Sequence, residues 1–218
     1  MADENDLPEG SKKKLIRAKE QWARDGRLLT GKSGAQRLPP GQHLVKDWPV
    51  LDIGIQPAVS RDEWRLTIDG AVENPLRWNW RDYMSQLQTK LITDIHCVTA
   101  WSRYDNNWEG VLAQTILAEV RPKAEVRHVI FHSHDSYTTN VTLEDFAAPD
   151  VIVAHSWEGQ PLSTAHGGPV RIMLPRRYLW KSAKWVRRIE FSATDKPGFW
   201  ENRGYHNEAD PWTEERYS

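Results

Sequence analysis

Residues 91–110 read LITDIHCVTAWSRYDNNWEG and contain the single cysteine of the chain, Cys97. The first part, from Leu91 to Val98, is rich in β-branched residues, which predicts a strand. The polar and aromatic residues that follow predict a loop, so Cys97 is expected at a strand-to-loop junction. Folds commonly present reactive groups on such loops. A lone cysteine is by default a small buried hydrophobe, and that interpretation stays open on composition alone.

The segments on either side predict a domain made mostly of strands. Alternation at residues 64–68 before the Asp69-Gly70 turn, and apolar runs at 126–131, 151–154, 170–174 and 185–191, are typical of strands. Asn79 and Thr142 can begin short helices. A helical stripe at residues 112–120 ends before Pro122. The pattern predicts an α+β fold, with a mainly mixed β core and several short helices.

The length of 218 residues is sufficient for one substantial core. We expect an N-terminal arm at residues 1–36, with a helix that Ser11 can cap, and one domain over residues 37–218. Within this domain, the Pro-rich segment at residues 38–49 is expected to be extended.

Composition excludes several classes of function. The net charge of -1 offers no bulk attraction for nucleic acid. No run reaches the roughly 18 apolar residues that a spanning helix needs, so no membrane insertion is expected. The acidic, polar start lacks the apolar core of a secretory signal, which predicts a cytoplasmic location. One cysteine cannot form an internal disulfide, a C-x-x-C pair or a cysteine zinc cluster.

Several motifs, in order and spacing, resemble one enzyme family. They are residues 96–110, the stretches HGGPVR at 166–171, PRRY at 175–178 and KSAKWV at 181–186, and the shorter matches at 38–42 and 69–75. Together they resemble the sulfite-oxidase-like molybdopterin-binding oxidoreductases, in particular small bacterial members. The Cys-x-x-x-Trp-Ser core is nearer to the methionine-sulfoxide reductase catalytic subunit than to sulfite oxidase proper. The resemblance implies the sulfite-oxidase molybdopterin-binding fold.

The resemblance also implies a cofactor and its ligands. Cys97 would be the one protein ligand of molybdenum, a role that suits a soft thiolate. The cofactor would be molybdenum-molybdopterin without a nucleotide, and the implied activity is two-electron oxygen-atom transfer on a small-molecule substrate. The residues expected to bind the pterin and its phosphate are Ser133, His166, Arg171, Ser182, Lys184, Asp52 and Gly54.

A substrate side and a redox partner complete this hypothesis. We expect His96, Trp101, Arg103 and Tyr104 to border the open face of the metal, because their loop would wrap around it. Arg103 would attract an anionic or oxo-bearing substrate, and Arg103 and His96 would favour a thiolate if they lie close to Cys97. The chain has no C-x-x-C-H haem motif and no G-x-G-x-x-G dinucleotide motif. A separate haem or flavin electron-transfer protein is therefore expected.

Other classes of function remain possible on the sequence. The run His132-Ser133-His134-Asp135 is similar to the metal sites of hydrolases, although the aspartate stands one residue too close. A β-rich module that uses its tryptophans to stack ligands would explain the 12 Trp residues. A relative that has lost its cofactor is a further alternative.

Overall fold

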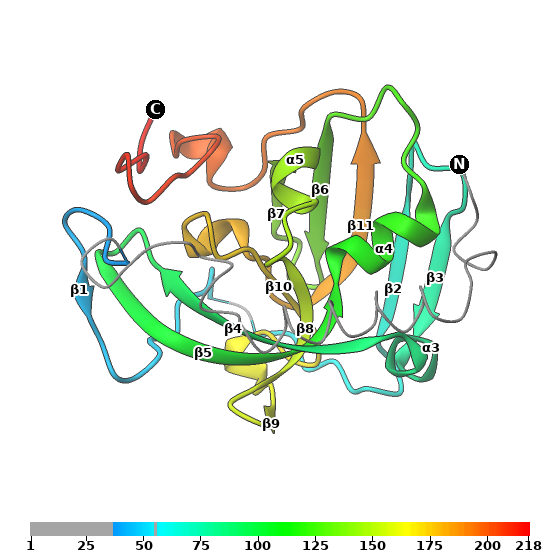
Figure 1. Cartoon of the computed structure of the whole chain (residues 1–218), viewed down its shortest axis with the longest axis horizontal. Helices are drawn as coiled ribbons and strands as arrows, with labels where there is room; N and C mark the ends of the chain where they lie inside the picture. Colours follow the sequence, from blue (N-terminus) through cyan, green and yellow to red (C-terminus); the bar gives the residue numbers. More distant parts are fainter. Residues whose placement is uncertain (1–36, 55) are drawn as a thin grey trace, which may run out of the picture.

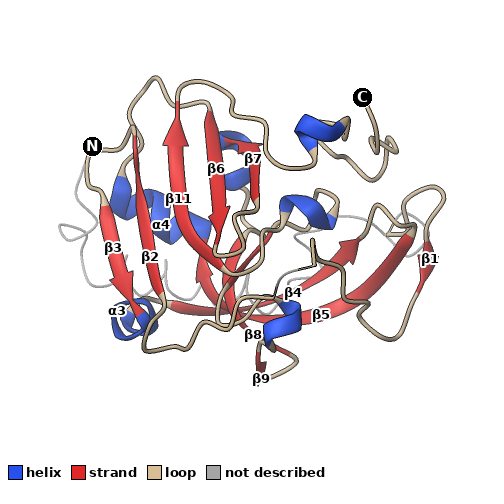
Figure 2. Ribbon diagram, turned by 180° about the vertical axis from the view of Figure 1, so that it is seen from behind, coloured by secondary structure: helices blue, strands red, loops and turns tan. Residues whose placement is uncertain are grey.

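The computed structural model describes residues 37–54 and 56–218. The arm expected at residues 1–36 lies outside the described residues. Figures 1 and 2 show two sheets, one with upright strands and the other running beneath it, with short helices at their edges. The predicted α+β class, a mixed β core with short helices, is confirmed.

The upright sheet has five strands in the order β3-β2-β11-β6-β7. Their bounds are β2 Arg65–Gly70, β3 Leu76–Asn79, β6 His128–Ser133, β7 Thr138–Thr142 and β11 Val186–Ser192. The sheet is mixed, because β11 runs parallel to β2 and antiparallel to β6. This pairing places the end of β6 beside the start of β11, where Ser133 lies opposite Val186.

The second sheet is built on a long hairpin. Its strands are β1 His43–Leu44, β4 Gln88–His96, β5 Trp101–Leu112, β8 Ile152–Trp157, β9 Gln160–Pro161 and β10 Arg171–Met173. β5 is central: it pairs with β4, β8 and, in parallel, β1. Figure 1 shows it as a long curved strand beneath the upright sheet.

Short helices connect these strands, and two of the α-helices begin at polar caps. They are α3 Trp80–Ser85, α4 Ala113–Val120 and α5 Leu143–Phe146, with 3₁₀ turns η3 Thr164–His166, η4 Leu179–Lys181 and η5 Glu201–Arg203. Asn79 forms a capping box with Asp82, and the Thr142 side chain accepts from Asp145 N, as the sequence predicts for both caps. Among the described residues, no helix is both long and apolar enough to cross a membrane.

The main core fills the space between the two sheets. Leu66, Ile68, Phe131 and Ile189 of the upright sheet pack with residues of the second sheet and of α4, and all are fully buried. A second cluster lies around Cys97, with Trp48, Trp101 and Trp108 among its members. The cysteine is thus packed as a small hydrophobe on one side.

The structure corrects one local prediction. The loop expected after Cys97 is a tight turn over residues 97–100, and β5 starts at once with Trp101. The polar residues of 101–110 therefore belong to a strand, where successive side chains point to opposite faces. The sequence did not show this alternation, because Trp, Ser, Arg and Tyr in succession give no clear apolar period.

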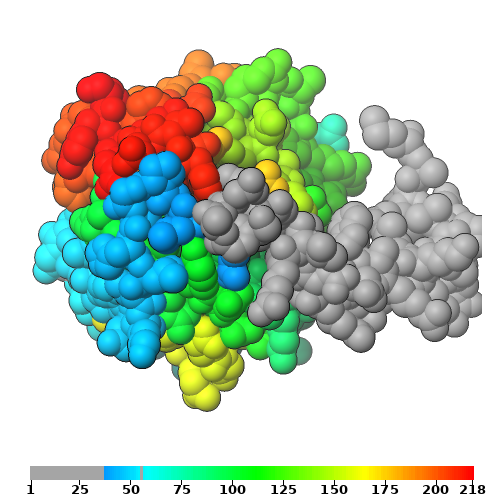
Figure 3. Space-filling view, turned by 60° about the vertical axis from the view of Figure 1, so that its left-hand side comes forward, coloured from blue at the N-terminus to red at the C-terminus, as the bar shows by residue number. Residues whose placement is uncertain are grey.

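The C-terminal tail closes one side of the domain. It has little regular structure beyond η5, yet Trp200 and Tyr205 pack on η4. Arg216 donates to Val98 O, beside Cys97. Figure 3 shows the tail, in red, against the segment around residue 41, in blue, where Glu214 lies close to Gly41. Both ends of the described chain meet next to the cysteine.

Candidate functional site

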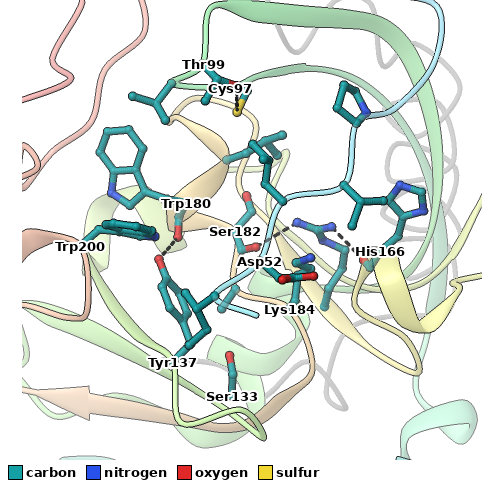
Figure 4. A pocket seen from close by; sticks show the side chains of 18 of the residues that line it. Asp52, Cys97, Thr99, Ser133, Tyr137, His166, Trp180, Ser182, Lys184 and Trp200 are labelled. Carbon is teal, nitrogen blue, oxygen red and sulfur yellow. Dashed lines mark hydrogen bonds between the residues drawn. The ribbon is translucent and has the colours of Figure 1, made fainter. Parts of the chain in front are cut away.

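A cavity of about 350 Å³ opens beside Cys97. It lies between the β4–β5 turn, the segment 48–53, the end of β6, the 166–185 region and the C-terminal tail. Figure 4 shows Cys97 and Thr99 at one end, Ser133 and Tyr137 at the other, and Ser182 and Lys184 between them. The cavity therefore joins residues from most of the chain.

The backbone of the β4–β5 turn fixes the position of Cys97. Cys97 N donates to Trp101 O at 2.8 Å and Ala100 N donates to Cys97 O at 3.1 Å, while Ala100 takes a left-handed conformation with φ 69°. The Gln42 side chain also donates to Cys97 O, at 3.0 Å. With its backbone held from both sides, the side chain can only face the cavity, as Figure 4 shows.

The surroundings of the Cys97 sulfur differ from those expected. Its Sγ lies 3.1 Å from Thr99 Oγ1, and burial raises the pKa of the thiol, while the hydrogen bond with Thr99 and the positive charge of Arg216 lower it to a lesser degree. Neither His96 nor Arg103 contributes. The expectation that these two residues favour a thiolate is not supported by their positions.

Arg171 is a buried cation with only carbonyl hydrogen-bond partners among the described residues. Its guanidinium donates to His166 O at 2.8 Å, Ser182 O at 3.0 Å and Ile172 O at 3.3 Å. Burial alone lowers the pKa of Arg171, to about 9. The guanidinium also lies over the Trp48 ring, at 5.0 Å. Its five N–H donors exceed these three carbonyl partners, and its charge has no carboxylate hydrogen bond among the described residues, which favours an anion beside it.

Lys184 is the second cation of the cavity. Its Nζ donates to Ala165 O at 2.9 Å and lies over the Trp185 ring. Burial, followed by the neighbouring charge of Arg171, lowers the pKa of Lys184 to about 8. A buried lysine whose protonation is depressed by a neighbouring arginine is stabilised in its charged form when an anion binds beside it.

Two serines and one histidine add neutral polar groups. Ser133 Oγ is buried and has no hydrogen-bond partner within residues 37–54 and 56–218. Ser182 Oγ accepts from Leu174 N at 3.0 Å and so keeps its own proton to donate. His166 stacks on Trp48 with ring centroids 4.1 Å apart, and burial lowers its pKa, so the ring is neutral at pH 7.

Two carboxylates lie at the same cavity. Asp52 is exposed, and hydrogen bonds from Gln56 and from Gly54 N lower its pKa. Burial raises the pKa of Asp135, which accepts from Tyr137 N. Gly54 does not line the cavity, and it acts by holding Asp52 with a bond of 2.8 Å.

The structure brings together most, but not all, of the residues expected from the sequence. Those that line the cavity are Asp52, Cys97, Trp101, Ser133, His166, Arg171, Ser182 and Lys184. His96, Arg103 and Tyr104 are absent from its lining. The β4–β5 pairing explains this, because His96 lies opposite Ser102 and Arg103 opposite Ile95, within strands that run away from the turn.

The three excluded residues have other contacts. Arg103 donates to Lys46 O at 3.0 Å, pairs with Glu158 at 3.2 Å and lies over the Trp157 ring. Tyr104 lies under the Arg37 guanidinium, at 4.2 Å. His96 is buried, with Nδ1 2.8 Å from Ser102 Oγ. All three therefore stabilise the walls of the hairpin and do not face the cavity.

Sequence patterns gave no sign of the aromatic wall. Trp48, Trp180, Trp185, Trp200 and Tyr205 line the cavity together with Trp101. Trp180 stacks on Tyr178 with centroids 5.3 Å apart, and Trp200 lies 4.8 Å from Tyr205. The high Trp count was the only available signal, and it did not say which indoles face a ligand.

The alternative metal site at His132 and His134 has no support. No cluster of three or more His, Cys, Asp or Glu side chains in the described part of the chain could hold a metal ion. His132 Nε2 is instead 2.9 Å from Glu190 Oε2, on the outer side of the sheet. His134 lies beyond the end of β6 and does not share a face with His132.

This cavity fits a bulky redox cofactor that carries an anionic group. A phosphate could accept hydrogen bonds from the unpaired Ser133 hydroxyl and from Arg171 and Lys184, which make no hydrogen bond to a carboxylate among the described residues. The Cys97 sulfur lies at the opposite end of the cavity. Such a site can hold a large ligand with an anionic group, and Cys97 provides a sulfur atom that such a ligand could contact. The comparisons with known proteins identify the class.

The chain belongs to the family described as oxidoreductase molybdopterin binding domain, whose model matches residues 53–200. It is 40% identical over 183 residues to the uncharacterized oxidoreductase YuiH of Bacillus subtilis, covering 84% of this chain and 92% of that protein. It is 26% identical over 148 residues to a putative protein-methionine-sulfoxide reductase subunit, YedZ1, of Azospira oryzae, covering 68% of this chain and 56% of the relative.

A solved structure has the same fold. The sulfane dehydrogenase SoxCD of Paracoccus pantotrophus matches with a TM-score of 0.61 and 22% identity, over 72% of this chain and 46% of that one. The chain thus spans only about half of SoxCD and of the reductase subunit. Membership of the family makes this protein a molybdopterin-dependent oxidoreductase, as the sequence motifs indicated. Molybdopterin is the dithiolene pterin that carries molybdenum.

Proposed function

We propose that Cys97 is the only protein ligand of the molybdenum and that the protein catalyses two-electron oxygen-atom transfer on a small substrate. The observation that carries the proposal is that the Cys97 sulfur shares one cavity with Arg171, Lys184 and the unpaired hydroxyl of Ser133. When bound, the molybdenum-pterin supplies the two-electron redox chemistry. The protein's own residues bind and orient that cofactor.

Each group of residues has a distinct task in this proposal. Arg171 and Lys184, assisted by Ser133 and Ser182, hold the phosphate through charge-assisted and hydroxyl hydrogen bonds. His166 and Asp52 bind the pterin, which presents both donors and acceptors on its ring. Trp101 covers the sulfur end. We propose the form of the cofactor without a nucleotide, as the resemblance to the family implies.

Electrons are exchanged with a separate haem or flavin protein. The similarity to a protein named as a reductase subunit supports a divided system. The cytoplasmic location expected from the polar start of the sequence stays a prediction.

The test is metal and pterin analysis of protein produced in a host that makes molybdopterin. We expect close to one molybdenum per chain in the unchanged protein, and the loss of a sulfur ligand from the X-ray absorption spectrum in Cys97→Ser. His132→Gln is the matched control, since it removes the alternative ligand and should leave molybdenum content unchanged. Molybdenum bound identically in Cys97→Ser, or lost in His132→Gln, would overturn the assignment.

A further inference from the structure

A chain of hydrogen bonds reaches Cys97 through three buried side chains that do not line the cavity. His96 Nδ1 lies 2.8 Å from Ser102 Oγ, which donates to Gln42 Oε1 at 3.3 Å. The Gln42 amide nitrogen in turn donates to Cys97 O at 3.0 Å. Because the three side chains are buried, water does not compete for these bonds, and each bond polarises the next.

The last bond of this chain fixes the direction of the others. A backbone carbonyl can only accept, so Gln42 turns its NH₂ group to Cys97 O and its carbonyl oxygen to Ser102. The single proton of the Ser102 hydroxyl is therefore given to Gln42. The Ser102 oxygen is then an acceptor for His96, which must donate from Nδ1. In the neutral His96 ring, only the tautomer with its proton on Nδ1 completes the chain.

The far end of the chain is held by the C-terminal tail. The His96 and Trp212 ring centroids are 4.9 Å apart, with the rings at 79° to each other. Both side chains line a second cavity, of about 390 Å³, which shares none of its described lining residues with the first. The chain therefore crosses the hairpin from one cavity to Cys97 at the edge of the other.

The Cys97 carbonyl matters because it helps to set the direction of the sulfur. Cys97 N is fixed by its bond to Trp101 O, and the peptide plane of residues 97–98 is the other plane that meets at the Cys97 α-carbon. Within the turn, this second plane is held only by Ala100 N, from a residue in the costly left-handed conformation. Gln42 supplies the additional bond that keeps the plane from rotating.

We propose that Gln42, Ser102 and His96 are positioning residues for Cys97, and that His96 acts through its Nδ1–H tautomer. Under the proposed function, on which this inference rests, the chain holds the sulfur in the direction in which it binds molybdenum. Residues behind a metal ligand commonly orient it in this way. His96 thus acts on the metal site through Cys97, from a position that does not touch the cofactor.

Nitrogen-15 NMR of the cofactor-free protein tests the tautomer. Correlations between the ring protons and the two ring nitrogens should place the proton of neutral His96 on Nδ1. The His96 signals are assigned by their absence from the spectrum of His96→Asn. A proton found on Nε2 would make Nδ1 an acceptor and take the Ser102 proton away from Gln42, which would overturn the proposal.

The rate at which iodoacetamide alkylates Cys97 tests the coupling in the same cofactor-free protein. Cys97 is the single cysteine, so the reaction follows one sulfur. Gln42→Met and His96→Gln each remove one bond, and each should raise the rate about fivefold, because the turn opens more often. His96→Asn, whose amide replaces the Nδ1–H group, should restore the original rate. His132→Asn is the matched control, since His132 bonds to Glu190 and lines neither cavity.

A double variant distinguishes one chain from two separate structural effects. Gln42→Met/His96→Gln should react no faster than Gln42→Met alone, because both changes interrupt the same chain. If the two accelerations multiply instead, or if His96→Asn reacts as fast as His96→Gln, the residues do not act through one another and the proposal is refuted.

The loaded protein separates failure of this inference from failure of the proposed function. At equal molybdenum content, the sulfur-to-metal charge-transfer absorption should weaken in His96→Gln and recover in His96→Asn. Identical spectra of molybdenum-loaded variants contradict this inference alone. Protein that takes up no molybdenum contradicts the proposed function, and the two measurements on cofactor-free protein still decide whether His96 positions Cys97.

Discussion

Lys181 Nζ lies 2.6 Å from Glu201 Oε1, and the two side chains are 1% and 2% exposed. Lys181 also donates to the backbone and side-chain oxygens of Asn140. The same carboxylate oxygen accepts from Trp180 Nε1 at 3.1 Å. A buried ion pair thus ties the tail to η4 and orients the indole of Trp180 at the cavity.

Breaking this pair should destabilise the fold strongly. Lys181→Met leaves the Glu201 carboxylate buried without its counter-ion, and we expect the free energy of unfolding in urea to fall by about 3–5 kcal/mol. The double variant Lys181→Met/Glu201→Gln removes both charges and should recover part of that loss. If the single and double variants unfold at the same urea concentration, the charges of Lys181 and Glu201 do not stabilise each other.

Anion binding at the cation pair should weaken as the pH rises through about 8. Lys184 binds an anion when protonated, and its pKa in the folded protein is lowered to about 8. Sulfate, which stays a dianion throughout, should bind cofactor-free protein more weakly at pH 9 than at pH 7, as measured by calorimetry. Lys184→Arg should move this loss to higher pH, because guanidinium keeps its proton.

The control for that experiment is Lys196→Met, since Lys196 pairs with Glu190 at 2.6 Å and does not line the cavity. Its pH profile should match the unchanged protein. Without a ligand, the pKa of Lys184 is about 8 in the folded protein and 10.5 in the unfolded chain, so between these pH values the unfolded chain binds more protons than the folded protein. The contribution of Lys184 to the free energy of unfolding therefore rises over this pH range. A sulfate affinity that is constant across pH 7–9 would contradict the role of Lys184.

Ser133→Ala should have opposite effects on the free and loaded protein. Its buried hydroxyl has no partner, so deleting it should leave the unfolding free energy of cofactor-free protein unchanged or raise it by up to about 1 kcal/mol. In the loaded protein the same deletion should accelerate release of the pterin, followed by its fluorescence. Loss of stability in the cofactor-free form would show that Ser133 has a structural role instead.

Gly167→Ala should disturb the anion site through Lys184. Gly167 has φ 99°, and an added Cβ would lie 2.9 Å from both Cβ and Cγ of Lys184. We expect about 1–2 kcal/mol of backbone destabilisation together with weaker sulfate binding. Gly159→Ala is the matched control, because Gly159 has φ 73° but nothing within 4 Å of the added carbon. It should lose stability without any change in sulfate affinity.

Arg103→Ala should leave molybdenum content and turnover unchanged, because Arg103 does not line the cavity. A small loss of stability is expected from its contacts with Lys46 and Glu158. Turnover with reduced viologen and thermal unfolding measure the two effects. A hundredfold loss of turnover in a folded, metal-loaded variant would restore the role that the sequence suggested for this residue.

The sequence predicted the residues at the cationic part of the cavity better than those of its aromatic wall, for a physical reason. Arg171, Ser182 and Lys184 lie in one short region whose motifs keep their spacing, so resemblance could place them. Trp48 and Trp200 reach the same cavity from segments without helical or strand periodicity, and only tertiary packing brings them there.

The misplacement of Arg103 has a related cause. Arg103 follows Cys97 closely in the sequence, but a step of two residues along a strand moves the side chain by about 7 Å. Only the β4–β5 register, with Arg103 opposite Ile95, shows that it has left the turn. A run of mixed polar and aromatic residues does not show where a strand begins, so this pairing register could not be predicted from the sequence.

Two side chains that are distant in the sequence hold the β4–β5 turn in place. Gln42 and Arg216 bind the carbonyls of Cys97 and Val98 from 55 and 118 residues away. Contacts across such separations form late, since long loops must close first. The Cys97 sulfur therefore acquires its final orientation only when the segment around Gln42 and the segment around Arg216 have both docked, so this end of the cavity is completed late in folding.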